Sequence, residues 1–335
     1  MPSFAEDLLK KAESYLDKGE FKVAEGIVDR FFNDVPEKDR TPALLMQAHL
    51  VAAKALAFRA EHVDALSHCS EAFALARKSG DVKAEAMTLR WLGYIHWRKG
   101  DFRKALEYAS EGIERARIAK DRELEGVFRV DIGNCYVGLG QFKRGDTEYK
   151  VAVGILEGIP GTPELLRAYN NLGDDLKNSG EWVEAERYFS KVKSMAGDNI
   201  KWRGWGDFNR AECLIEMGRF DEARKDLDEA IVLLERSGDK MGRAAAFKYL
   251  GLLNAKKKDW FNAKRNLEFA RDLMRELGMP VHEAKVVREL GKMYMWKGEF
   301  ALARKNLEEA RDLFRKHDST VDADRTEMIL RDVGK

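Results

Sequence analysis

Hydrophobic and polar positions repeat along this chain with a period of about 40 residues. In each unit a short turn, such as KGDF at 99–102, separates two stretches with apolar residues at helical spacing. The turn has glycine as its usual second residue, and this position falls at 19, 60, 100, 140, 180, 218, 258 and 298. Since one such unit would leave an apolar face exposed to water, the pattern predicts eight stacked helix pairs.

Two columns of small residues keep the register of the turn, and each predicts a close approach between helices. Seven places before the turn glycine they are Ala12, Ala53, Gly93, Gly133, Gly173, Ala211, Gly251 and Gly291. Five places after it they are Ala24, Ala65, Ala105, Gly145, Ala185, Ala223, Ala263 and Ala303. A third column, two places after the glycine, is expected to plug the crossing of the two helices: Phe21, His62, Phe102, Phe142, Trp182, Phe220, Trp260 and Phe300.

The segment NLGDDLKNSGEWVEA at 171–185 resembles the tetratricopeptide repeat, and the resemblance covers nearly the whole chain. It implies an all-α fold, a right-handed superhelical solenoid of eight repeats with a C-terminal capping helix, forming one domain over 1–335. The long period and the linkers at 76–86 and 234–246 are similar to those of Pins-type scaffolds, kinesin light chains and Rap-type bacterial peptide receptors. The expected repeats span 4–40, 42–80, 82–120, 122–158, 163–197, 200–238, 240–278 and 281–318, and the cap helix 320–334.

Local signals refine this expectation. Ser3 and Glu6 form an S-x-x-E capping box at the first helix. The Gly/Pro segment GIPGTPE at 158–164 is expected to stop a helix. At 196–207 the period shortens to 38, which predicts a local pinch or bend.

Composition excludes several classes of function. The 59 Lys and Arg residues nearly balance the 58 Asp and Glu residues, which argues against binding of nucleic acid by bulk charge. The sequence has no apolar run of membrane-spanning length and no signal peptide, so a soluble, cytoplasmic protein without membrane contact is expected. Three widely spaced cysteines favour a reducing compartment.

The sequence offers little support for catalysis. Its six histidines form no H-x-x-x-H pair, and His49, His62 and His96 fall in core positions of the repeat. Cys135 and Cys213 occupy one slot in two different repeats, which favours a structural role. We therefore expect no enzyme, no cofactor and no metal.

Helix geometry divides the segment RWLGYIHWRKGDF at 90–102 into two faces. Leu89, Leu92, Gly93 and His96 share one stripe, which is the expected packing face. The opposite side is not needed by the repeat core, and the tetratricopeptide resemblance implies that it lines a concave groove. Across the repeats, the predicted partner-binding residues are Arg90, Trp91, Tyr94, Trp97, Arg98, Asp131, Asn134, Arg167, Asn170, Asn171, Asp174, Trp205, Phe208, Asn209, Lys248, Tyr249, Lys285, Arg288, Lys292 and Trp296.

This predicted groove changes in character along the chain, from acidic residues such as Glu13 to lysines and arginines in the last repeats. Its asparagines suit the backbone of an extended peptide, and its aromatic residues would anchor apolar side chains. We therefore expect a protein or peptide partner with an acidic portion near repeats seven and eight. The alternative is that these long side chains only cover the helices or pack on the next repeat.

Three functions remain open from the sequence. The first is a protein-interaction scaffold that binds an extended peptide or a helix. The second is an RNA-binding solenoid, because residues 241–335 carry 21 Lys and Arg against 15 Asp and Glu, a difference of +6. The third, a Rap-like sensor of short peptides, is weakened because the chain starts directly in a repeat. Binding of the Hsp70 or Hsp90 C-terminus is not expected, because Val130, Trp205 and Asn209 occupy the cation positions of the dicarboxylate clamp.

Overall fold

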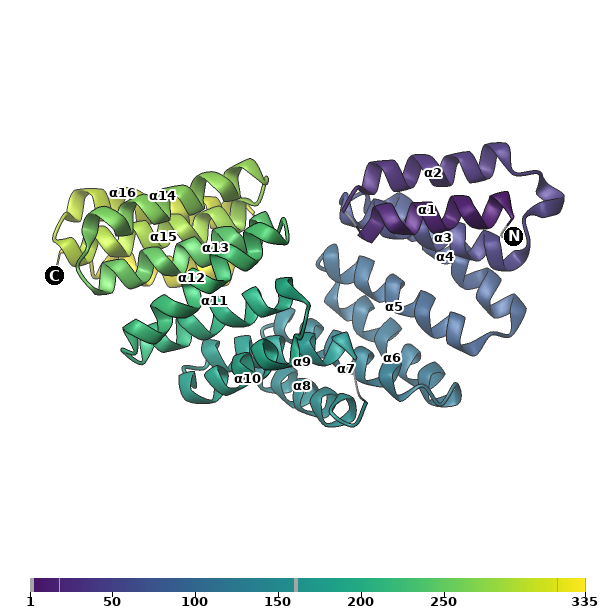
Figure 1. Cartoon of the computed structure of the whole chain (residues 1–335), viewed down its shortest axis with the longest axis horizontal. Helices are drawn as coiled ribbons and strands as arrows, with labels where there is room; N and C mark the ends of the chain where they lie inside the picture. The colour runs from purple at the N-terminus through teal and green to yellow at the C-terminus, as the bar shows by residue number, and fades with distance from the viewer. Residues whose placement is uncertain (1–2, 18, 160–161, 318, 335) are drawn as a thin grey trace. The chain divides into compact units, whose positions relative to one another are not determined.

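Every regular element in the described part of the chain is helical. A computed structural model describes residues 3–17, 19–159, 162–317 and 319–334 (Figure 1). The first eight α-helices are α1 Phe4–Asp17, α2 Phe21–Asp34, α3 Pro42–Phe58, α4 His62–Ser79, α5 Val82–Arg98, α6 Phe102–Ile118, α7 Arg122–Gly138 and α8 Phe142–Leu156. The others are α9 Pro163–Asn178, α10 Trp182–Met195, α11 Ile200–Glu216, α12 Phe220–Arg236, α13 Lys240–Lys256, α14 Trp260–Glu276, α15 Pro280–Lys297, α16 Phe300–Lys316 and α17 Thr320–Arg331, with a 3-10 turn at Glu37–Asp39.

The chain divides into two compact units, Met1–Asn171 and Leu172–Lys335. In the first unit α1, α3, α5 and α7 contact one another in succession, and in the second unit α11, α13 and α15 do the same. The odd-numbered helices therefore form a continuous layer within each unit. Even-numbered helices pack between two odd-numbered ones, as α6 does between α5 and α7 and as α12 does between α11 and α13.

The eight turns within the helix pairs share one backbone conformation. The glycines of the turn have positive φ, which ranges from 74° at Gly140 to 85° at Gly298. Where glycine is missing, Ala60 and Lys258 still adopt φ of 65° and 62°. The register predicted from the sequence is thus present even in the two repeats that lack the turn glycine, and there it forces an L-residue into the left-handed region.

We expect Ala60→Gly and Lys258→Gly each to raise the free energy of unfolding by about 0.5–1 kcal/mol, because glycine adopts this conformation without a steric penalty. Chemical denaturation followed by circular dichroism would measure the change. Lys257→Gly is the control, since φ at Lys257 is −81° and glycine there should not stabilise the protein. No gain at either turn position would contradict the expectation.

The predicted small residues are buried, and the first column is matched in size by the residue sixteen places later. Gly133 lies against the ring of Tyr149, where an added Cβ would come within 2.4 Å of the ring atom Cε1. Gly93 instead faces Ala109, and the nearest atom to an added Cβ there is 3.5 Å away. Glycine is therefore required only where the facing residue is large.

The aromatic column is corrected by the structure, because these side chains are only partly buried and do not plug their own crossing. Phe300 is 47% exposed. Phe21 stacks on Phe58, with ring centroids 4.7 Å apart, and Phe102 covers Gly138. Both contacts reach the end of the first helix of the following repeat, so the column joins one repeat to the next.

Helix ends follow the sequence signals. The Ser3 amide donates to Glu6 Oε2 at 2.7 Å, and the Glu6 amide donates to Ser3 Oγ at 3.3 Å, which is the predicted capping box. The predicted stop at 158–164 follows the end of α8 at Leu156 and overlaps the start of α9 at Pro163, and its residues 160 and 161 lie outside the described part. Near 196–207, Gly206 lets α11 approach the backbone of Lys193 in α10. No helix among the described residues is long and apolar enough to cross a membrane.

Two histidines meet inside the N-terminal unit. His49 Nδ1 and His68 Nδ1 are 3.0 Å apart, so one ring must donate to the other. Burial lowers the pKa of both rings, and His68 lowers that of His49 further, while Glu71 opposes both shifts. The folded state therefore binds fewer protons than the unfolded state once the pH falls below 6.5.

We expect the unit to lose stability as the pH falls from about 7.5 to about 5.5, because the partly buried histidine pair resists protonation. Urea denaturation at these two pH values would measure the loss. His68→Gln should weaken the pH dependence, whereas His317→Gln at an exposed site should leave it unchanged. An unchanged pH dependence in the His68 variant would show that other groups cause it.

Candidate functional site

The C-terminal unit contains a polar cavity of about 320 Å³. Its walls come from the odd-numbered helices α11, α13 and α15, with one residue from the start of α10. Because consecutive odd-numbered helices lie side by side, their same-register positions converge on one space. The lining residues are Trp182, Glu212, Glu216, Lys248, Tyr249, Leu252, Lys285, Arg288, Glu289 and Lys292.

The acidic side chains of the cavity are all engaged. Lys292 Nζ lies 2.8 Å from Glu289 Oε2, and Lys256 Nζ lies 3.5 Å from Glu216 Oε2. Glu212 pairs with Lys177. Each glutamate therefore has its own ion-pair partner, and Glu212 and Glu289 act on Lys248 only from beyond ion-pair distance.

Among the cations of the cavity, Arg288 is also engaged, because its Nη1 lies 2.8 Å from Asp322 Oδ1 in α17. Lys248 and Lys285 differ. Within the part of the chain that the structure describes, neither has a carboxylate at ion-pair distance; Lys248 Nζ instead lies 3.9 Å from the ring centroid of Tyr249. Burial, together with Lys177 and Lys285, lowers the pKa of Lys248 to about 8 against the opposing effect of Glu212 and Glu289.

A network beside the cavity centres on Lys177, whose side chain is only 11% exposed. Its ammonium lies 3.0 Å from Asp174 Oδ1, donates to Glu212 and reaches Asn209 Oδ1 at 3.4 Å. Burial alone would lower the pKa of Lys177, but Asp174 and Glu212 raise it well above its usual value. Lys177 is therefore charged, and it fixes the orientation of the Glu212 carboxylate.

An apolar surface adjoins the cavity through Trp182, which lines both. This second depression, of about 440 Å³, is formed by residues 180–184, Arg187 and Met217. Val183 within it is 60% exposed. On the opposite repeat, Trp296 is 38% exposed beneath the ammonium groups of Lys256 and Lys292.

The predicted aromatic cluster of the N-terminal unit is a ladder of rings. Trp91 and Tyr94 have centroids 5.2 Å apart, and Tyr94 and Trp97 are stacked at 6.1 Å. Leu89, Leu92 and Gly93 are buried as expected. The expectation that the core does not need the other face is wrong, however, because Trp91 and Tyr94 pack against the buried cluster around Leu56 and Leu92.

Polar residues of the same predicted face hold neighbouring repeats together. Arg90 Nε donates to Asp131 at 3.2 Å, and Arg167 Nη1 donates to the same carboxylate at 3.1 Å. Trp97 Nε1 reaches the carbonyl oxygen of Asn134 at 3.4 Å. Arg98 is exposed and donates to the Tyr94 hydroxyl at 3.0 Å.

The asparagines correct another expectation, since their amides bind within the protein. Asn134 Oδ1 accepts from Tyr149 at 2.7 Å and from Asn171 Nδ2 at 2.8 Å. Asn170 and Asn209 are buried, with 5% and 4% of their surfaces exposed. These groups stabilise the repeats and do not offer both a donor and an acceptor to a peptide backbone.

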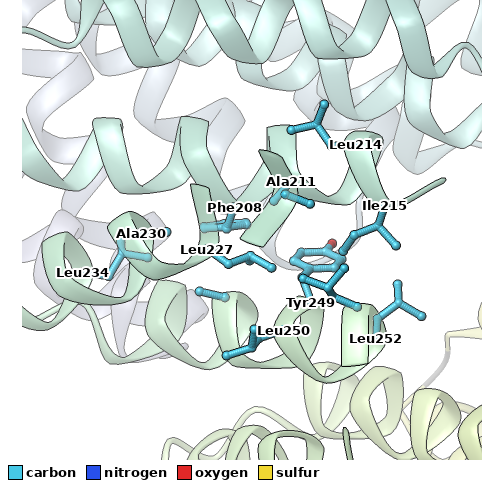
Figure 2. Packing of buried hydrophobic residues seen from close by; sticks show 13 residues of the cluster. Phe208, Ala211, Leu214, Ile215, Leu227, Ala230, Leu234, Tyr249, Leu250 and Leu252 are labelled. Atoms are coloured by element: carbon cyan, nitrogen blue, oxygen red, sulfur yellow. The ribbon is translucent and has the colours of Figure 1, made fainter. Parts of the chain in front are cut away.

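Two predicted groove aromatics belong to the core of the C-terminal unit. Figure 2 shows Phe208 and Tyr249 among the aliphatic side chains of α11, α12 and α13, and both are more than nine-tenths buried. Trp205 packs on this cluster and donates from Nε1 to Asp239 Oδ2 at 2.6 Å. Tyr249 still borders the cavity, whereas Phe208 does not.

Reactive groups elsewhere are sequestered. Cys69, Cys135 and Cys213 are buried thiols, and burial raises the pKa of each to about 12.

Sequence reasoning missed a carboxylate cluster at Asp207, Asp226 and Glu229. There Lys193 Nζ lies within 2.6–3.2 Å of all three, so an ammonium already supplies the positive charge.

The comparison with protein families agrees with the repeated helix pairs. Models of the tetratricopeptide repeat match residues 165–196 and 208–233. The chain contains tetratricopeptide repeats. The matched segments cover α9 with α10 and most of α11 with α12, so the family models identify two of the repeats whose register the turns define throughout.

The curated proteins similar to this chain are distant relatives. Response regulator aspartate phosphatase J of Bacillus subtilis (strain 168) is 26% identical over 176 residues, 46% of this chain and 45% of that protein. The chloroplastic protein FLUORESCENT IN BLUE LIGHT of Arabidopsis thaliana is 25% identical over 138 residues, 39% of this chain and 43% of that protein. This chain therefore spans less than half the length of either relative.

Similar solved structures support the fold. The apo quorum sensor NprR from B. thuringiensis has a TM-score of 0.70 at 16% identity, covering 94% of this chain and 89% of that one. A Rap protein complexed with competence and sporulation factor has a TM-score of 0.60 at 13% identity, covering 98% and 97%. At these identities the likeness is one of fold alone.

Proposed function

We propose that this protein is an interaction scaffold that binds an extended peptide of a partner along the odd-numbered helices of its C-terminal unit. The observation that carries the proposal is the cavity between α11, α13 and α15, with two unpaired lysines in its wall and an apolar depression adjoining it at Trp182. Polar anchors next to an exposed apolar surface suit a peptide with side chains of both kinds.

The similar Rap structure supports this proposal as an analogy, because that protein is complexed with competence and sporulation factor. The proposal differs from the sequence-based expectation in two ways. The asparagines and Phe208 no longer belong to the binding surface, and the aromatic ladder around Trp91 serves mainly to pack the N-terminal repeats. The expected acidic portion of the peptide remains part of the proposal.

The alternative of RNA binding receives less support from the site. Many Lys and Arg side chains of the last repeats are held in ion pairs, such as Arg275 with Glu283 and Arg311 with Glu327. Arg288 is held by Asp322 in the same way. Base stacking requires exposed rings along a basic surface, and Tyr249 is buried.

The proposal is tested by selecting from a bead-bound library of random heptapeptides with the fluorescently labelled protein. We expect enrichment of a sequence family, and loss of that enrichment in the Trp182→Ala/Trp296→Ala variant, because Trp182 lines the cavity and Trp296 lies beneath Lys292 of its wall. Phe261→Ala is the control, because Phe261 is 76% exposed on the even-numbered helix α14. A wild-type protein that enriches no sequence, either from this library or from one with phosphoserine at its central position, would refute the proposal.

A peptide ending in EEVD should not bind through the dicarboxylate clamp of some tetratricopeptide-repeat proteins. Val130 is fully buried, and Trp205 and Asn209 are held by Asp239 and Lys177, so no cation stands at these positions. We expect isothermal titration calorimetry to show no heat above that of a scrambled peptide. Micromolar binding that survives substitution of Lys248 and Lys285 would contradict this expectation.

A further inference from the structure

The charge balance of the cavity leaves two positive charges without partners. Glu212, Glu216 and Glu289 pair with Lys177, Lys256 and Lys292, and Arg288 pairs with Asp322. Only Lys248 and Lys285 line the cavity without a carboxylate at ion-pair distance in the described residues. Both lysines are half-buried, so water does not fully solvate their ammonium groups.

We propose that Lys248 and Lys285 bind the phosphoryl group of a phosphorylated side chain in the partner peptide. This inference rests on the proposed function and adds the chemistry of the ligand. A phosphate monoester carries a charge of about −1.5 to −2 at neutral pH, which matches the two unpaired ammonium groups. A single carboxylate would leave one of them uncompensated.

The surroundings of the two lysines favour a compact ligand. They stand on adjacent helices, α13 and α15, and face one cavity of about 320 Å³, which has room for a phosphoryl group and the side chain that carries it. Each ammonium supplies three N–H donors to the acceptor oxygens of the phosphate. The neighbouring glutamates have their own cations, and none of them lies within ion-pair distance of Lys248 or Lys285.

The crowding of like charges around Lys248 in the absence of a ligand also favours binding of an anion. Lys248 is held near Lys177 and Lys285, and its low pKa of about 8 reports the combined cost of burial and of these like charges. A protein maintains such an arrangement at a cost in stability unless a ligand of opposite charge relieves it. Binding of a dianion would remove the repulsion between the two lysines.

Three bead-bound heptapeptide libraries test the inference, with phosphoserine, glutamate or serine fixed at the central position. We expect the wild-type protein to be retained at least about tenfold more strongly on the phosphoserine library than on the serine library at low salt. Lys248→Met/Lys285→Met should lose this preference. Lys225→Met/Lys305→Met should keep it, because these exposed lysines lie on the even-numbered helices α12 and α16.

Each outcome separates the inference from the proposed function. Equal retention on the phosphoserine and serine libraries, or on the phosphoserine and glutamate libraries, overturns the phosphoryl assignment and leaves peptide binding intact. Absence of retention on all three overturns both. Inorganic phosphate should displace the phosphopeptides only when present in large excess, and displacement at equal concentration would assign the cavity to free phosphate and overturn the peptide assignment.

Discussion

Gly133→Ala should lower the free energy of unfolding of the N-terminal unit by about 2 kcal/mol, whereas Gly93→Ala at the same position of the preceding repeat should not lower it. A Cβ at Gly133 would lie 2.4 Å from Tyr149 Cε1. The Tyr149 ring is 3% exposed, and its hydroxyl donates to Asn134, so it cannot move away freely. At Gly93 the Cβ fits, and alanine adds its higher helix propensity.

Hydrogen–deuterium exchange measured by mass spectrometry on peptides from α7 and α8 would localise this loss, because repeat proteins need not unfold in a single step. Gly133→Ala/Tyr149→Leu provides a further check. The sixth repeat contains the same combination, Ala211 facing Leu227, and both are fully buried. The double variant should therefore recover part of the stability, and a double variant no better than Gly133→Ala would show that contact with Tyr149 is not the cause.

Lys177→Met should destabilise the C-terminal unit by about 3 kcal/mol, because it leaves Glu212 without its principal counter-ion. Lys177 also contacts Asp174 and lies 5.4 Å from the ring centroid of Phe189. Burial alone would raise the pKa of Glu212, and Lys177 with Lys248 holds it below its usual value. Without Lys177 the carboxylate loses much of this stabilisation.

Lys177→Met/Glu212→Gln is the decisive comparison, since it removes both charges together. We expect it to be more stable than Lys177→Met, because no buried carboxylate remains uncompensated. Urea denaturation of the four proteins in the cycle would give the coupling free energy. Strictly additive effects would show that the two side chains do not interact, and would contradict the electrostatic role of Lys177.

The fold was accessible from the sequence because its signals are local and repeat eight times. The predicted turns are present at Ala60 and Lys258, where the glycine itself is absent. Their positions could still be predicted, because the small residues before and after each turn keep the same spacing. The sequence did not show on which repeat the side chains of the aromatic column pack. Whether Phe21 fills its own helix pair or covers the next one depends on the stacking distance between repeats, which a single repeat does not encode.

The candidate site was predictable only in part. Helical periodicity brought Lys248, Lys285, Arg288 and Lys292 to one face, and the structure places all four around one cavity. Periodicity could not show which cations are neutralised, because the ion-pair partners are remote in sequence. Asp322, which pairs with Arg288, lies in the last helix, and Lys177, which pairs with Glu212, lies four helices before α13. Nor could it separate Phe208, which is buried, from Trp296, which is exposed.

The match in size between positions sixteen residues apart also limits how such a protein can be recombined. Gly133 with Tyr149, Gly173 with Phe189 and Ala211 with Leu227 are three different solutions to the same contact. A crossover within a helix pair would join half of one solution to half of another, placing alanine against tyrosine or phenylalanine. A crossover between pairs transfers both halves together, so intact helix pairs are the segments that evolution or a protein engineer can exchange.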